Sequence, residues 1–146
     1  MREILFRGKR KDNGEWVEGF YYVRQAMHGK LLLGEPEHVI TTGVLKIYGA
    51  YGEREQLSQV EVIPETVGQF TGMTAESGVK IFEGDILEHP NKAVSVDRYV
   101  VKWDDVLGAW NAKWTEGAGG VYIGVASLLM ELVGNIHDNP ELLEVK

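Results

Sequence analysis

The chain has 146 residues and a formal net charge of −7, with 44% apolar residues, 25% charged residues and no cysteine. This composition is that of a globular protein, and the lack of cysteine excludes disulfides, zinc-thiolate sites and cysteine nucleophiles. Residues 1–64 carry nine acidic and nine basic side chains, whereas residues 65–146 carry thirteen acidic and six basic ones. A duplex-binding protein usually presents a basic patch, so this distribution argues against a nucleic-acid partner.

The N-terminal stretch REILFRGKRKDNGEWVEGFYYV indicates two strands joined at Asn13 and Gly14. This dipeptide favours a type I′ hairpin turn, in which both central residues have positive φ. We interpret the basic side chains before the turn as a solvated hairpin end; they are Arg7, Lys9, Arg10 and Lys11. The stretch lacks the apolar run of a signal peptide, and no segment is apolar enough to span a bilayer. We therefore expect a cytoplasmic protein with no membrane partner.

The middle of the chain continues with short apolar or alternating runs. HVITTGVLKIYG fits either a strand pair or one bent strand, and LSQVEVI alternates as a strand that ends before Pro64. PETVGQ fits a single helical turn. We place a boundary at about residue 64, between an N-terminal β subdomain (1–64) and a C-terminal subdomain (65–146); one continuous core is the alternative.

The stretch 71–87, TGMTAESGVKIFEGDIL, is typical of a hairpin that turns at Gly78. We expect Gly84 to form a bulge and Asp85 to accept hydrogen bonds from nearby backbone N–H groups. Glu83 and Asp85 would share a face of an extended strand, which leaves a catalytic carboxylate pair as an alternative. The glycines do not follow the phosphate-loop pattern, and zinc, serine-nucleophile and dinucleotide motifs are missing, so we expect no cofactor and no metal.

The segment RYVVKWDDVLGAWNAKWTE predicts a hairpin with alternating faces. We expect Trp110 and Trp114 to fill a core, because large aromatic side chains dominate small cores. A surface position of Trp103, Tyr99 or either of the other two would instead offer a partner contact.

Towards the C-terminus, VYIGVA predicts a further strand. SLLMELVGNI fits either a helical turn followed by a strand or one bent strand. In HDNPELL, Pro140 fits the first position of a helical turn, and Leu142 and Leu143 would provide a tail that docks on a partner.

Four blocks occur in the order MREILFRGKRKDNGEWVEG, TVGQFTGMTAESGVKIFEGDIL, VVKWDD and VGNIHDNPELL. Together they resemble the YopX family of phage, prophage and mobile-element proteins over nearly the whole chain. The resemblance implies a mostly β fold, with an N-terminal β-hairpin region packed on a C-terminal SH3-type barrel, and it implies no catalytic residues. The turn TAESGV departs from the charged turn with Asn-Gly that the family tends to have, which affects the turn type and not the fold.

We therefore expect a small non-enzymatic β protein, encoded by a phage or prophage, that binds a host or phage protein. The candidate contact residues are Tyr99, Trp103, Trp110, Trp114, Leu142 and Leu143. The candidate turn or bulge residues are Asn13, Gly14, Gly78, Gly84, Asp85 and Pro140. One alternative is a structural protein that assembles into a homo-oligomer. Another is an enzyme that uses the carboxylates of Glu83, Asp85, Asp104 and Asp105.

Overall fold

A computed structural model describes residues 1–28, 31–95, 97–115 and 119–144, and the side chains of these residues except 26–28 and 31–33. The fold is mostly β, as predicted, with two antiparallel arrangements of strands and one α-helix among the described residues. The chain divides into two compact units. The N-terminal unit is Ile4–Gly68, and the C-terminal unit is Met1–Glu3 together with Gln69–Lys146.

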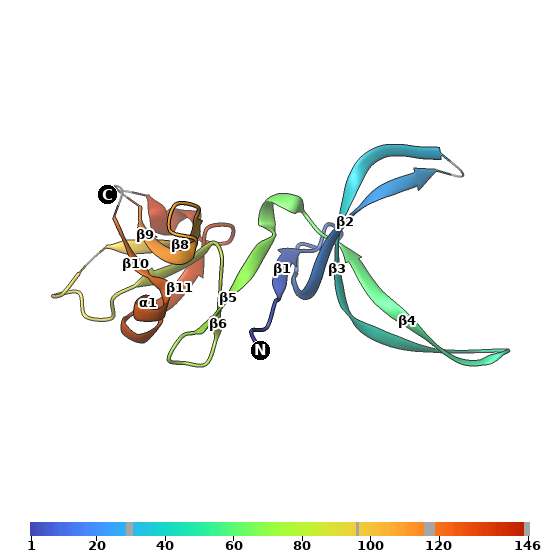
Figure 1. Cartoon of the computed structure of the whole chain (residues 1–146), viewed down its shortest axis with the longest axis horizontal. Coiled ribbons are helices and arrows are strands. Elements are labelled where there is room, and N and C mark those ends of the chain that lie inside the picture. Colours follow the sequence, from blue (N-terminus) through green and yellow to red (C-terminus); the bar gives the residue numbers. More distant parts are fainter. Residues whose placement is uncertain (29–30, 96, 116–118, 145–146) are drawn as a thin grey trace. The chain divides into compact units, whose positions relative to one another are not determined.

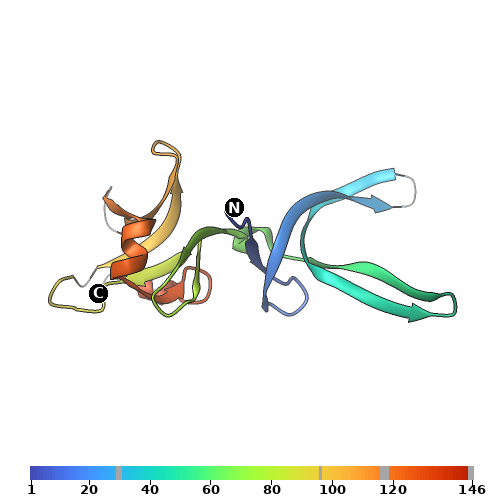
Figure 2. The ribbon, with the colours of Figure 1, turned by 60° about the horizontal axis from the view of Figure 1, so that its bottom comes forward.

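Antiparallel strands build the N-terminal unit in the order β4-β3-β2-β1 (Figure 1). They are β1 (Phe6–Lys9), β2 (Trp16–His28), β3 (Leu31–Gly49) and β4 (Gly52–Glu61), followed by the 3-10 turn η1 (Pro64–Thr66). Strand β3 pairs with both β2 and β4 along residues 39–41, with β2 alone before them and with β4 alone after them. The two long hairpins therefore diverge from this point, as Figure 2 shows. Of the two predicted alternatives for HVITTGVLKIYG, the single bent strand is confirmed.

The core of the N-terminal unit is small and lies where the two hairpins meet. Val39, Ile40 and Val62 are at most 1% exposed there. Gly19 on β2 faces Thr41 so closely that an added Cβ would lie 2.0 Å from the Thr41 carbonyl oxygen. Glycine is therefore required at this position for the two strands to approach each other.

The N-terminal hairpin is confirmed, but the predicted type I′ turn is wrong. Gly14 has a φ of 73°, whereas Asn13 is not among the residues with positive φ. The loop runs from residue 11 to 14, because the Arg10 N–H donates to the Glu15 carbonyl at 2.8 Å and the Gly14 N–H donates to the Arg10 carbonyl at 2.9 Å. Asn13 Oδ1 accepts a hydrogen bond from the Glu15 N–H at 2.9 Å. This side-chain bond stabilises a longer loop that needs one left-handed residue.

The C-terminal unit contains a five-stranded antiparallel sheet in the order β10-β9-β8-β7-β11 and the antiparallel hairpin of β5 and β6. The hairpin strands are β5 (Gly68–Thr74), which begins at the unit boundary, and β6 (Lys80–Phe82). The sheet strands are β7 (Asp85–Glu88), β8 (Arg98–Asp104), β9 (Ala109–Trp114), β10 (Gly120–Tyr122) and β11 (Glu131–Asn135). In the described residues β10 and β11 lie at opposite edges, so the expected SH3-type barrel is not found as a closed barrel.

One α-helix, α1 (Ile123–Leu129), packs on the sheet and completes the core of the C-terminal unit. The predicted strand over VYIGVA is therefore wrong beyond Tyr122. The physical reason is the spacing of Ile123, Ala126 and Met130, which places three buried apolar side chains on one side of the helical segment. The core residues are Ala75, Ile81, Leu87, Tyr99, Val101, Trp110, Ala112, Ile123, Ala126 and Met130.

A tight turn at Glu83 and Gly84 separates β6 from β7, in place of the predicted bulge within one strand. Gly84 has a φ of 87°. The Asp85 carboxylate is 1% exposed, and its Oδ2 accepts a hydrogen bond from the Phe82 N–H at 2.7 Å. At the preceding hairpin, Gly78 has a φ of 86° and its N–H donates to the Ala75 carbonyl at 2.8 Å.

Candidate functional site: a hollow lined by two tryptophans

The β8–β9 hairpin carries two aromatic pairs on the face that it turns towards the core. Tyr99 is paired in register with Trp114, and Trp103 with Trp110. In each pair one ring is buried and the other is exposed: Tyr99 and Trp110 are 5% and 9% exposed, whereas Trp114 and Trp103 are 45% and 43% exposed. Trp110 is a core residue, as predicted, but the prediction that Trp114 fills the core is wrong. Trp114 is the last residue of β9, at the end of the core face.

Trp103 and Trp110 line a hollow of about 290 Å³ together with Arg2, Gln69 and Glu83. The two indole rings are in edge contact, with centroids 5.2 Å apart and planes at 73°. We call this set of five residues the tryptophan hollow. All five belong to the C-terminal unit, although they come from the chain start, β5, the β6–β7 turn, β8 and β9.

A backbone hydrogen bond joins two of the polar residues that line the tryptophan hollow. The Glu83 N–H donates to the Gln69 carbonyl at 2.9 Å, which holds the β6–β7 turn against β5. The Arg2 side chain runs past Gly72, where an added Cβ would lie 3.7 Å from the Arg2 Cγ and Cδ atoms. In the part of the chain that the structure describes, neither the Arg2 guanidinium nor the Glu83 carboxylate has an ion-pair partner, so both charges are available to a ligand.

This arrangement is suited to recognition of a polypeptide. It offers two indole surfaces, one cation, one anion and one amide, which match an apolar side chain and its neighbouring polar groups. Its volume lies at the lower limit of the usual range for small-molecule pockets, so it fits about one large side chain. Sequence reasoning missed Arg2 and Gln69, and had considered Glu83 as a carboxylate for chemistry and not as part of a binding hollow.

Two of the other carboxylates considered for catalysis, Asp85 and Asp104, accept hydrogen bonds from backbone N–H groups at turns. Asp104 Oδ1 accepts hydrogen bonds from the N–H groups of Val106 and Leu107, both at 3.0 Å, and its Oδ2 lies 2.8 Å from the Lys113 ammonium. The hydrogen bond from Lys113, followed by those from the backbone, lowers the pKa of Asp104. Asp105 is exposed in the same turn. Glu83 and Asp85 do not share a strand face, because the tight turn separates them and Asp85 is buried.

The C-terminal tail is tied to the sheet. The 3-10 turn η2 (Pro140–Leu143) has Pro140 in its first turn, and the Asn139 side chain makes no cap hydrogen bond. Arg98 Nη1 on β8 donates to the Leu142 carbonyl at 2.6 Å. Leu142 and Leu143 are half-buried, so they are less exposed than Trp103 and are weaker candidates for a partner contact.

An ion-pair cluster lies beside this tail at the start of β8. The Glu88 carboxylate lies 2.7 Å from the Lys92 ammonium and 3.3 Å from Arg98 Nε. The hydrogen bond from Lys92, together with that from Arg98, lowers the pKa of Glu88.

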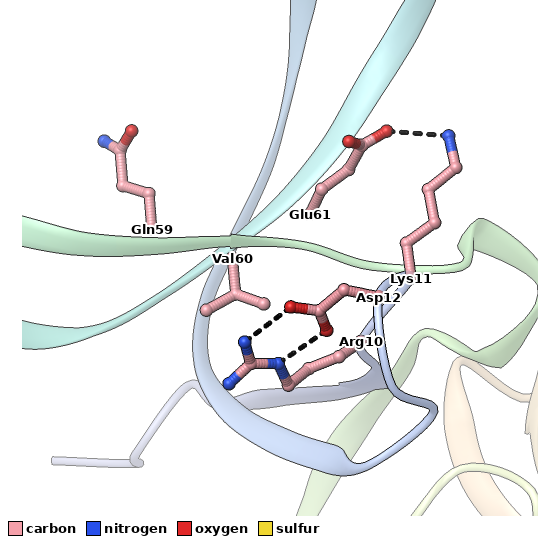
Figure 3. A pocket seen from close by; sticks show the side chains of 6 residues that line it. All are labelled: Arg10, Lys11, Asp12, Gln59, Val60 and Glu61. Carbon is pink, nitrogen blue, oxygen red and sulfur yellow. Dashed lines mark hydrogen bonds and ion pairs between the residues drawn. The ribbon is translucent and has the colours of Figure 1, made fainter.

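A second hollow, of about 370 Å³, lies in the N-terminal unit beside the basic cluster (Figure 3). Its cations already have acidic partners: Arg10 makes two hydrogen bonds with Asp12, at 2.9 and 2.7 Å, and the Lys11 ammonium lies 2.9 Å from Glu61. Arg7, earlier in the cluster, lies over the Trp16 ring at 4.7 Å. A phosphate ligand would have to compete with these contacts, so this hollow is the weaker candidate site.

The described helices include none that is long and apolar enough to cross a membrane. Among the residues that the structure describes, no group of three His, Asp or Glu side chains is placed to hold a metal ion.

Comparisons with known proteins agree with the resemblance noted in the sequence. The solved structure described as "Crystal structure of protein EF1440 from Enterococcus faecalis" matches with a TM-score of 0.58 and 23% identity, over 99% of this chain and 100% of that chain. At this identity the likeness shows the fold alone. No curated protein matches. The family model described as YopX protein matches residues 5–144, which is nearly the whole chain. This chain therefore belongs to the YopX protein family.

Proposed function

We propose that this chain is a non-enzymatic protein-binding module, and that the tryptophan hollow receives a side chain of the partner. The observation that carries this proposal is Trp103, which is 43% exposed and lines the tryptophan hollow together with the buried Trp110. Tryptophan and arginine are enriched at the positions that dominate binding energy in protein interfaces. Here Arg2 and Trp103 line the same hollow.

The charge of the C-terminal unit favours a partner with a basic surface. Residues 65–146 carry thirteen acidic and six basic side chains. Complementary charge speeds association and makes it sensitive to salt. Within the hollow, Glu83 would pair with a basic group beside the inserted side chain, whereas Arg2 would pair with a carboxylate or a backbone carbonyl.

The non-enzymatic part of the proposal is supported by the roles of the candidate carboxylates. Asp85 and Asp104 accept hydrogen bonds from the backbone of their own turns. The proposed setting, a phage or prophage protein that acts in the bacterial cytoplasm, is supported by the family. The SH3-type barrel is likewise a proposal. It is supported by the pairing of β7 with β11, which come first and last in chain order among the strands of the five-stranded sheet.

The first test is a pull-down from a lysate of the bacterium that carries the gene, at low and high salt, followed by calorimetry with the recovered protein. We expect one stoichiometric protein that is released at high salt. Trp103→Ala should weaken its binding at least about tenfold, as expected for loss of a dominant interface residue. Tyr122→Ala is the matched control, because it removes an aromatic side chain that is 57% exposed in the same sheet.

Two outcomes would contradict this proposal. If Trp103→Ala binds the recovered protein as tightly as the original chain does, the tryptophan hollow is not the contact. If Trp114→Ala weakens binding and Trp103→Ala does not, the contact lies at the opposite end of the β8–β9 hairpin, outside the hollow.

A further inference from the structure

The part of the β3–β4 hairpin beyond residue 42 is a ribbon of two strands. Strand β3 pairs with β2 up to Thr41, and from Gly43 to Gly49 it pairs with β4 alone. We call residues 43–49 and 52–58 the β3–β4 arm; Figures 1 and 2 show it extending away from the other strands of its unit. A two-stranded hairpin is marginally stable in water by itself. Unlike the sheet of the C-terminal unit, this arm carries no covering element among the described residues of its own unit.

Apolar side chains on this arm are exposed to solvent. Val44, Tyr48 and Leu57 are 56%, 75% and 53% exposed. They share one face, because Val44 is in register with Leu57 and Tyr48 lies four residues further along β3. We call this the tyrosine face, and its members are Val44, Lys46, Tyr48, Glu53, Glu55 and Leu57. Such a set of exposed apolar residues, arranged between charged ones, is typical of a protein contact surface.

The charges of the arm are balanced, in contrast to those of the chain. The arm carries the basic residues Lys46 and Arg54 and the acidic residues Glu53 and Glu55, whereas the chain has a net charge of −7. On the tyrosine face the Lys46 ammonium lies 2.9 Å from Glu53, and Glu55 is the cross-strand partner of Lys46. A surface with both signs of charge complements another copy of itself, since a two-fold contact can place the cation of one copy opposite the acids of the other.

We propose that the tyrosine face of the β3–β4 arm binds the tyrosine face of a second copy of this chain. In the two-fold contact, Val44, Tyr48 and Leu57 of both copies pack together, and Lys46 of each copy lies opposite Glu55 of the other. This inference is independent of the tryptophan hollow, which belongs to the other unit.

The size of the arm sets the strength of the contact. Seven residues of a strand extend about 20 Å, and two strands lie about 5 Å apart. A contact between two such ribbons is smaller than the roughly 800 Å² per partner of a standard interface. The dimer is therefore reversible, and its population depends on protein concentration.

The first test is sedimentation velocity of the purified chain from about 1 μM to about 1 mM, a range that covers weak to moderate dissociation constants. We expect a shift from monomer towards dimer as the concentration rises. A monomer throughout this range would overturn the proposal.

A charge exchange tests whether the contact is between copies. Lys46→Glu and Glu55→Lys, each alone, place like charges opposite each other in the dimer, so each should raise the dissociation constant about tenfold. An equimolar mixture of the two variants should associate at least as tightly as the original chain. Both variants lose the cross-strand pair of Lys46 and Glu55 within the arm, and Lys46→Glu also loses the ion pair with Glu53. A purely local effect would therefore persist in the mixture, and a mixture as monomeric as its components would overturn the proposal.

A matched pair of neighbouring substitutions tests which face is used. Val44 and Leu45 are 56% and 55% exposed but point to opposite faces of the arm. Val44→Thr should weaken dimerisation, and Leu45→Thr should leave the dissociation constant unchanged. The reverse pattern would show that the tyrosine face is not the contact.

Discussion

The buried carboxylate of Asp85 is the clearest point at which one side chain holds the C-terminal unit together. Its Oδ2 accepts the Phe82 N–H at 2.7 Å, and both residues are at most 2% exposed. In Asp85→Ala this buried hydrogen bond would be lost. A hydrogen bond to a charged group contributes about 1.5–3 kcal/mol to stability.

We therefore expect Asp85→Ala to lower the free energy of unfolding by about 2–3 kcal/mol. For a unit of about 80 residues, each kcal/mol shifts the Tm by about 4–8 °C, which corresponds to a decrease of roughly 8–24 °C. Asp85→Asn keeps a neutral acceptor at the same place, so its loss should be about half as large. Thermal unfolding followed by tryptophan fluorescence is the suitable assay, because Trp103, Trp110 and Trp114 all belong to this unit.

Asp105→Ala is the control for this prediction, since Asp105 is an exposed acid in the β8–β9 turn. Its effect should stay within about 0.5 kcal/mol, as is usual for a surface substitution. If Asp85→Ala unfolds at the same temperature as Asp105→Ala, the Asp85 carboxylate does not hold the β6–β7 turn and our account of the turn is wrong.

Three further predictions concern the same unit. Gly84→Ala and Gly78→Ala should each destabilise it by about 1–2 kcal/mol in urea unfolding, because both glycines have positive φ and an added Cβ makes at most ordinary van der Waals contact, 3.4 Å from Ile136 at Gly84; no loss at either position would contradict the left-handed backbone of these turns. Trp110→Ala should cost about 3–5 kcal/mol in the same assay, since it opens a core cavity, and Trp103→Ala should cost about 1 kcal/mol or less; similar losses would contradict the assignment of one core and one surface ring. The pKa of Glu88 is lower in the folded chain than its ordinary value near 4.5, so its ion pairs stabilise the fold above that pH, and this contribution is lost as the pH falls through the lower folded value. The free energy of unfolding, measured between pH 6 and pH 2, should therefore vary less in Glu88→Gln than in the original chain. An unchanged pH profile would count against the ion-pair cluster.

Local patterns predicted the β8–β9 hairpin well, because two-residue periodicity is a property of the strand itself. The alternation of Trp110, Ala112 and Trp114 is present as expected. The burial of a ring at the end of a strand depends on what covers it, however, and the pattern contains no such information. Trp114 is therefore exposed although it shares a face with the buried Trp110.

Segments with strand propensity were misassigned where packing favoured a helix. VYIGVA is rich in β-branched and aromatic residues, which favour strands in the absence of other contacts. Ile123 and Ala126 nevertheless pack on the sheet with helical spacing, and the contribution of their burial exceeds the small difference in propensity. Sequence reasoning from a single segment has no access to this contribution, since it comes from strands elsewhere in the chain.

The candidate site shows the same limit more strongly. The sequence pointed to the tryptophans as the feature most suited to binding, because four of them occur in 146 residues. The sequence did not indicate that Arg2 and Gln69 line one hollow with Trp103. Nearly seventy residues, which include the whole N-terminal unit, lie between Arg2 and Gln69 in the chain. The N-terminal unit is thus an insertion between residues 3 and 69 of the C-terminal unit. Arg2 and Gln69 lie on either side of this insertion in the chain, and both line the tryptophan hollow. Removal of the first three residues would take Arg2 out of the hollow, so it should weaken partner binding without affecting the β3–β4 arm.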